Sequence, residues 1–204
     1  PYSLVRLLEH FYEVVPDGMV NDRFGDTHWD FRTSEYLHNL DAEQSATWEN
    51  SRGIGFSYGY NRLEDARHYL TGADVVRHFV DVVSRGGNLL LHVGPTASGR
   101  IPAAQELTLR ELGGFCARHE AALFGSRVLG PEIATASEEP WVRWTSAEGW
   151  AHAFLGSPVE FSLILDTAAV DLDSLRAVDA EARVEDGRVL VRTDAVGRVS
   201  LRLR

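Results

Sequence analysis

The sequence contains no lysine, and all 20 of its basic residues are arginine. Without a lysine, and without the required glycine spacing, the turn at residues 94–100 is not a phosphate-binding P-loop. The 30 acidic residues leave a formal net charge of −10. Because a phosphate backbone or an anionic membrane surface would repel such a chain, neither nucleic acid nor a membrane is an expected partner.

Cysteine is nearly absent, since Cys116 stands alone and cannot form an internal disulfide. Its position in an apolar helical stretch fits a small buried hydrophobe better than a reactive thiol. The eight histidines show no paired spacing with cysteine or carboxylate that is typical of a metal site. We therefore expect no metal and no organic cofactor.

Long apolar runs are also missing. No run approaches the roughly 20 residues that span a bilayer, and no charged-then-apolar leader opens the sequence. The first residue, Pro1, leads directly into a helical pattern, so an earlier targeting segment could have preceded it and no compartment is predicted. The 44% hydrophobic content is ample for a packed core.

The first 127 residues have the pattern of an α/β fold. Residues 88–93 are apolar on both faces, as expected of a strand in a buried parallel sheet. The order helix, strand, loop, strand, helix, strand, helix is typical of a βα-barrel and predicts the second half of a (β/α) TIM-like barrel. The expected helices are 4–15, 74–84 and 103–124, the expected strands are 19–22, 53–58 and 88–93, and the expected loop is 23–50.

The pattern changes near residue 128 to short β-rich segments, with turns at 148–149 and 186–187. These segments predict a C-terminal antiparallel β-sandwich. The fold class is therefore α/β plus β, with one domain at 1–127 and a second at 128–204. The expected strands of the second domain are 141–145, 151–155, 159–165, 188–193 and 198–203.

Chemistry concentrates in the loop that begins at Arg23, which gathers an arginine, a histidine, aromatic side chains and carboxylates. Loops that follow barrel strands lie on the face where active sites form. A carboxylic acid beside an aromatic surface suits general acid catalysis, and an arginine nearby can hold ring oxygens or hydroxyls. The alternative is a surface loop whose charges pair with each other.

Four stretches in order carry a recognisable set of motifs, which are 20–36 (VNDRFG followed by HWDFRTSEY), 48–55 (WENSRGIG), 57–61 (SYGYN) and 82–95 (VVSRGGNLLLHVGP). Together they resemble the α-L-fucosidases of glycoside hydrolase family 29. The resemblance covers about residues 1–126, whereas the C-terminal part resembles the family only in position and type.

The resemblance implies a retaining exo-glycosidase that removes terminal α-L-fucose from an oligosaccharide or glycoconjugate. It implies that Glu35 is the general acid/base, that Arg23 contacts the sugar and that Tyr58 forms part of the apolar wall against the fucose methyl group. His28 lies in the same loop, where it serves either packing or substrate contact.

A retaining enzyme also needs a nucleophilic carboxylate. In the family this is an aspartate on the strand before the helix at Leu4, which precedes residue 1 of this sequence. We therefore expect a C-terminal portion that is inactive alone and needs the missing N-terminal half of the barrel as its partner. The alternative is a non-catalytic sugar-binding or structural chain that keeps only the acid/base half of the site.

Two residues depart from the family pattern. Phe24 replaces the usual tryptophan, and His92 replaces an asparagine. We interpret His92 as a hydrogen-bonded core histidine, with a modified group behind the site as the alternative. Three further carboxylates are interpreted as structural rather than catalytic: Asp22, Asp30 and Glu49.

Overall fold

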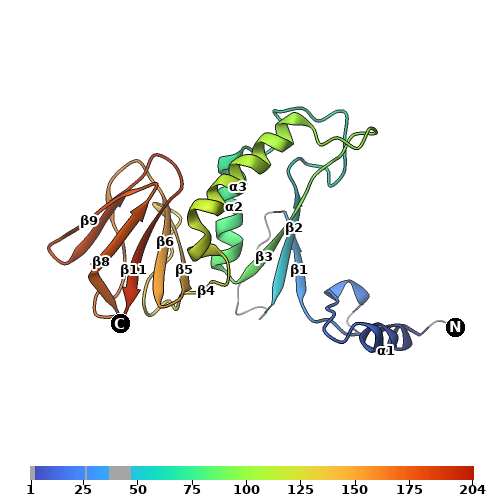
Figure 1. Cartoon of the computed structure of the whole chain (residues 1–204), viewed down its shortest axis with the longest axis horizontal. Helices are drawn as coiled ribbons and strands as arrows, with labels where there is room; N and C mark the ends of the chain where they lie inside the picture. The colour runs from blue at the N-terminus through green and yellow to red at the C-terminus, as the bar shows by residue number, and fades with distance from the viewer. Residues whose placement is uncertain (1–2, 26, 37–46) are drawn as a thin grey trace.

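The computed structural model describes residues 3–25, 27–36 and 47–204. The described chain has an α/β part followed by an antiparallel β part, and its two ends lie far apart (Figure 1). Helices α2 and α3 run between the parallel sheet on one side and the antiparallel strands on the other (Figure 1).

The α/β part is built on a three-stranded parallel sheet in the order β1-β2-β3. Strand β3 has the predicted position and parallel pairing, and the three helices agree with the predicted ranges to within two residues at their ends. The elements are α1 (Leu4–Val14), the 3-10 helix η1 (Asp22–Phe24), β1 (Arg32–Glu35), β2 (Trp48–Gly53), α2 (Gly72–Ser84), β3 (Gly87–His92) and α3 (Ala103–Leu123).

Two strand predictions were wrong. Residues 19–22 make only an isolated bridge, from Asn21 to Phe31. The strand cannot continue because the Asn21 side chain accepts a hydrogen bond from the Arg23 amide and so starts η1. The strand expected at 53–58 lies earlier, at β2, and the expected loop contains β1. The sequence of β1 is polar, but its backbone pairs with β2 over all four residues.

Helix α2 begins where the sequence places a capping box. The Thr71 side chain accepts from the Asp74 amide, and the Asp74 carboxylate accepts from the Thr71 amide and hydroxyl. These bonds satisfy amides that a helix start leaves unpaired. The helix therefore starts at a fixed point and packs its valine-rich face against α3 and the sheet.

The second part consists of two antiparallel sheets that enclose one hydrophobic core. The antiparallel prediction is confirmed, but β8 and β9 were not predicted, and the expected strand 159–165 shrinks to β7. The strands are β4 (Arg127–Val128), β5 (Trp141–Ala147), β6 (Trp150–Gly156), β7 (Phe161–Ser162), β8 (Val170–Val178), β9 (Glu181–Glu185), β10 (Arg188–Arg192) and β11 (Gly197–Leu203). The sheet orders are β7-β10-β9 and β4-β5-β6-β11-β8.

The two parts share a second core. Trp141 and Phe154 of the five-stranded sheet are buried against Val80 of α2 and Phe115 of α3. Next to this core, the buried guanidinium of Arg143 pairs with Asp81 of α2, so apolar and ionic contacts join the same elements.

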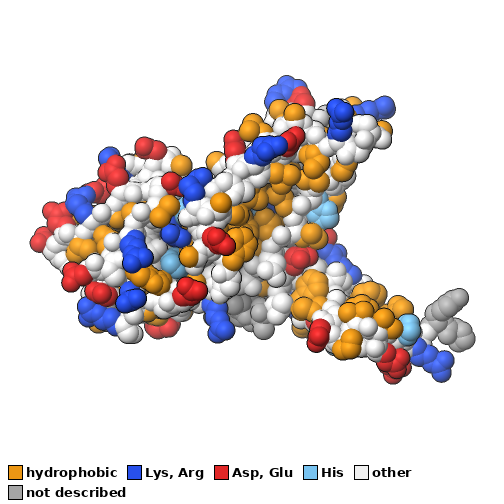
Figure 2. All heavy atoms as spheres, viewed as in Figure 1, with side chains coloured by type: hydrophobic (Ala, Val, Ile, Leu, Met, Phe, Trp, Pro, Cys, Tyr) orange, Lys and Arg blue, Asp and Glu red, His pale blue; other side chains and the backbone are white. Residues whose placement is uncertain are grey.

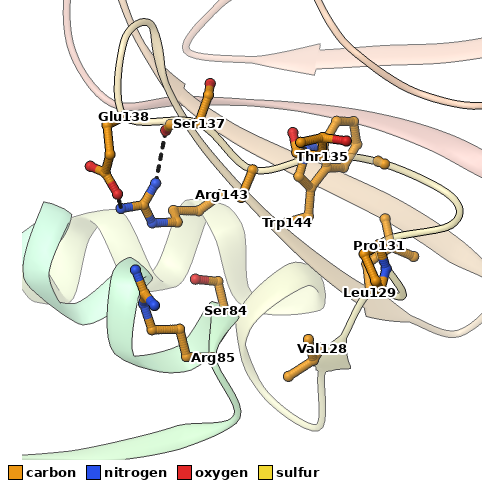
Figure 3. A pocket seen from close by; sticks show the side chains of 12 residues that line it. Ser84, Arg85, Val128, Leu129, Pro131, Thr135, Ser137, Glu138, Arg143 and Trp144 are labelled. Carbon is orange, nitrogen blue, oxygen red and sulfur yellow. Dashed lines mark hydrogen bonds and ion pairs between the residues drawn. The ribbon is translucent and has the colours of Figure 1, made fainter. Parts of the chain in front are cut away.

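A cavity of about 580 Å³ also lies at this junction, between the end of α2 and the segment before β5 (Figure 3). On its wall, Arg143 donates to the Glu138 carboxylate over 2.5 Å and to the Ser137 carbonyl over 2.8 Å. Ser84 and Arg85 come from the opposite wall (Figure 3). None of the predicted site residues lines this cavity.

Candidate functional site

The structure brings Arg23 and Glu35 together at the C-terminal end of the parallel sheet. Arg23 Nη2 donates to Glu35 Oε1 over 2.6 Å, and Arg23 Nε donates to Thr33 Oγ1 over 2.9 Å. Both members of the ion pair are about half exposed, with 55% and 47% of their side-chain surface accessible. The pair therefore presents a carboxylate and a guanidinium to solvent on the open side of the site.

The position of Arg23 is set by its neighbour. Asp22 Oδ1 accepts from the amide and the hydroxyl of Thr33, at 3.1 and 2.6 Å, which ties η1 to β1. Burial favours the protonated form of Asp22, but the two bonds from Thr33, the Asp22 amide and the charge of Arg23 together lower the pKa of the carboxyl. Asp22 therefore has a structural role, in line with its interpretation from the sequence.

His28 does not join this pair but lies in a separate cluster with Tyr12 and Asp30. The Tyr12 hydroxyl lies 2.5 Å from Asp30 Oδ2 and 2.9 Å from His28 Nε2. The hydrogen bonds from Tyr12 and from the Val20 amide lower the pKa of Asp30. Burial and the Asp30 carboxylate raise the pKa of Tyr12 to about 12. Both contacts of His28 come from this cluster, and its role in packing or substrate contact stays a prediction.

Tyr58 lies on the other side of the sheet end, among aromatic rings. Its ring centroid is 5.2 Å from that of Tyr36 and 4.9 Å from that of His92. Its hydroxyl donates to the Ser51 carbonyl over 3.2 Å, so the polar end of the side chain is satisfied by backbone. The half-buried ring can thus offer an apolar surface without leaving a polar group unpaired.

His92 ends β3 beside Tyr58. Its Nε2 lies 3.1 Å from Ser51 Oγ, and the side chain is only partly buried. The expected hydrogen bond is present, but the position is a strand end next to Tyr58 rather than the hydrophobic core. Phe24 is 38% exposed and makes no contact with these rings among the interactions of the described residues.

Tyr36 was not singled out from the sequence, yet it connects these groups. It follows Glu35 directly and has a left-handed backbone, with φ of 52°. Its amide donates to the Ser51 carbonyl over 3.1 Å, and its hydroxyl donates to the Phe56 carbonyl over 2.8 Å. A tyrosine is strained at such a φ, so these bonds must hold the turn in place.

Within the described residues, no group of three or more histidine, cysteine or acidic side chains is arranged to hold a metal ion. In the same part of the chain, no helix has the length and apolar character needed to cross a membrane.

Comparison with known proteins connects this geometry to a family. The model of the α-L-fucosidase family matches residues 3–121. An α-L-fucosidase of Dictyostelium discoideum is 33% identical over 141 residues, which are 67% of this chain and 30% of that protein. The plasma α-L-fucosidase of Homo sapiens is 31% identical over 153 residues, covering 72% of this chain and 33% of that protein.

Solved structures agree. The Thermotoga maritima α-fucosidase in complex with fucose superimposes with a TM-score of 0.75 and 29% identity, covering 97% of this chain and 48% of that one. Another solved α-L-fucosidase has a TM-score of 0.79 and 30% identity. The chain belongs to the α-L-fucosidase family. It spans about a third of the length of the curated relatives and about half of the solved structures that it matches.

Proposed function

We propose that this chain is the C-terminal portion of a retaining α-L-fucosidase, which releases terminal α-L-fucose from a fucosylated oligosaccharide or glycoconjugate. The observation that carries the proposal is the Arg23–Glu35 pair, which stands at the end of a parallel strand within the segment matched by the family model. The Thermotoga maritima relative in complex with fucose supports fucose as the sugar.

In this proposal Glu35 is the general acid/base. Its carboxyl protonates the leaving oxygen in the first step and activates water in the second. Arg23 reaches the same carboxylate over 2.6 Å and also donates to Thr33, and its other donors have no hydrogen-bond partner among the described residues, so they can contact the sugar.

Tyr58 supplies the surface that distinguishes fucose from other hexoses. Fucose is a 6-deoxy sugar, so its site needs an apolar wall where other hexoses carry a hydroxyl. The Tyr58 ring, fixed between Tyr36 and His92, fits that role. His28 is proposed as a substrate contact through Nδ1, because its Nε2 already contacts Tyr12 and Asp30.

The nucleophile is proposed to lie outside this chain, with the N-terminal half of a TIM-like barrel. Hydrophobic side chains gather on α1 and on the hollow surface between α3 and the parallel sheet (Figure 2). On α1, Val5, Leu7 and Val14 are more than half exposed, as is Leu107 of α3. Apolar surface of this extent needs a cover. We place the barrel part at 1–127 and a β-sandwich at 128–204.

The test is turnover of 4-nitrophenyl α-L-fucoside by the complete polypeptide, with the anomeric configuration of the released fucose followed by proton NMR. Retention of the α-configuration is expected. The isolated chain of 204 residues should give no turnover. Inverted product, or no turnover by the complete polypeptide, would refute the proposal.

The second candidate is a non-catalytic sugar-binding or structural chain that keeps the acid/base half of the site. It is favoured only if the complete polypeptide has no nucleophilic carboxylate. Calorimetric binding of fucose without turnover would distinguish it from the enzyme.

A further inference from the structure

A buried amide links α2 to the residues on both sides of Glu35. Asn50 of β2 is fully buried, and its Nδ2 donates to Ser34 Oγ over 3.0 Å and to the Tyr36 carbonyl over 3.2 Å. Its Oδ1 lies 2.8 Å from Nε2 of His78. One side chain thus holds the residue before Glu35 and the residue after it.

The orientation of this amide follows from its partners. The Tyr36 carbonyl can only accept a hydrogen bond, so it must face the NH₂ group of Asn50. Oδ1 therefore faces His78, whose Nε2 must carry the proton. The chain of donors then runs in one direction, from His78 to Asn50 and from Asn50 to Ser34 and Tyr36.

His78 is suited to this task by its surroundings. It lies on α2, behind the sheet, and Arg52 faces it from β2 while Asp81 faces it from α2. Burial, followed by the charge of Arg52, lowers the pKa of His78 to about 4. The ring is thus neutral near pH 7 and holds a single tautomer.

We propose that Asn50, oriented by His78, is a positioning residue that fixes the Glu35 carboxyl for proton transfer to the leaving group. The inference rests on the proposed function. Its physical basis is that Tyr36 has a strained left-handed backbone, which relaxes unless its carbonyl and amide are both held. Relaxation of that turn would move Glu35, which immediately precedes it.

The experiment compares Asn50→Leu with wild type in the complete polypeptide. Leucine has the same branched shape, although it is larger, and it makes no hydrogen bond. On fucosides with a poor leaving group, kcat/KM should fall by about 10–100-fold, because a small displacement of a catalytic group has a cost of this order. On a nitrophenyl fucoside, which needs little protonation, kcat/KM should change by less than about threefold.

His78→Phe provides a second variant should Asn50→Leu fold poorly. It should show the same dependence on the leaving group, and the double variant should be no worse than Asn50→Leu alone, because both side chains act through one chain of bonds. The matched control is Thr108→Val, which removes another buried hydrogen bond, from α3 to the Leu70 carbonyl, and should show no such dependence.

Amide hydrogen exchange supplies a readout that does not require turnover. In Asn50→Leu the Tyr36 amide should exchange at least about tenfold faster, since its turn has lost an anchor, whereas Thr108→Val should leave it unchanged. Equal losses of kcat/KM for good and poor leaving groups, or unchanged exchange at Tyr36, would overturn the inference. A wild-type protein inactive on every fucoside would instead refute the proposed function. The exchange result would still decide whether Asn50 holds the turn at Tyr36.

Discussion

Arg23 of η1 and Glu35 at the end of β1 form an ion pair across 2.6 Å, and Thr33 accepts a second bond from the same guanidinium. An exposed ion pair contributes little to stability, about 0–1 kcal/mol. The geometry of this pair is therefore more important for the site than for the fold.

Arg23→Lys tests whether the ion pair serves the site rather than the stability of the fold. Lysine keeps the charge but cannot reach Thr33 and Glu35 with a fixed fork of donors. We expect the free energy of unfolding to change by less than about 1 kcal/mol, and kcat/KM on a fucoside to fall by about tenfold or more. Denaturant titration and steady-state kinetics on the same preparation measure both. A large loss of stability would assign Arg23 to the fold instead.

Glu35→Ala tests the acid/base assignment. In the complete polypeptide we expect kcat/KM on poor leaving groups to fall by about 10²–10⁴-fold, with a much smaller loss on a nitrophenyl fucoside. Added azide should partly restore turnover of the nitrophenyl substrate, because it can attack the intermediate without a general base.

Asp30→Asn is the control for that experiment. Asp30 is held by Tyr12 and the Val20 amide, so its removal should lower turnover of all substrates together and give no azide rescue. Wild-type kinetics for Glu35→Ala on natural linkages would show that another carboxylate is the acid/base.

The Arg143–Asp81 pair provides a prediction on stability. Arg143 is 6% exposed, so Asp81→Ala leaves a buried guanidinium with less compensation and should cost about 3 kcal/mol of unfolding free energy. Glu138→Gln removes the other carboxylate partner, which is 74% exposed, and should cost less than about 1 kcal/mol. Equal effects of the two substitutions in urea titrations would contradict this reading.

Besides His78, two buried histidines predict how stability depends on pH. Burial, with the charge of Arg198, lowers the pKa of both His119 and His152 to about 4, although Asp179 opposes this at His119. The unfolded chain therefore binds protons that the folded chain does not. These histidines do not reduce the free energy of unfolding above about pH 6.5. As the pH falls from there toward 4, the free energy of unfolding decreases by about 1.4 kcal/mol per pH unit for each histidine.

His119→Phe should reduce that slope between pH 6.5 and 4.5. Its ring already lies between Phe115 and Phe154, so phenylalanine fits the surroundings, while Arg118, Arg198 and Asp179 remain as the charged neighbours. His10→Phe is the control, because His10 is 74% exposed. An unchanged slope for His119→Phe, measured by urea titration across this range, would show that other groups cause the loss.

The sequence predicted the elements whose apolar residues repeat regularly. Helix α2 and strand β3 were found this way, as were β5, β6 and β11. Strand β8 was missed because a register shift between Ser200 and Arg202 of its partner interrupts the pairing and its two-residue period. Strand β1 was missed because its four residues are polar and only Ser34 is buried.

The site residues also fall into those that the sequence predicted and those that it did not. Arg23, Glu35 and Tyr58 were recognised through motifs, but their neighbours were not. Tyr36 ends the first motif, but its role was not recognised because it depends on a backbone φ that no residue pattern predicts. His78 lies on a helix that was interpreted from its apolar face, and its bond to Asn50 joins residues 28 positions apart.

The core shared by α2, α3 and the five-stranded sheet has a consequence for how the molecule melts and evolves. Because Trp141 and Phe154 are buried against both helices, heat should disrupt the two parts in a single calorimetric transition. Cutting the chain near residue 128 would expose the two halves of this core, so both fragments should aggregate. The β-rich part thus packs against α2 and α3 as a fixed support. Recombination between relatives could replace it only together with the helix faces that contact it.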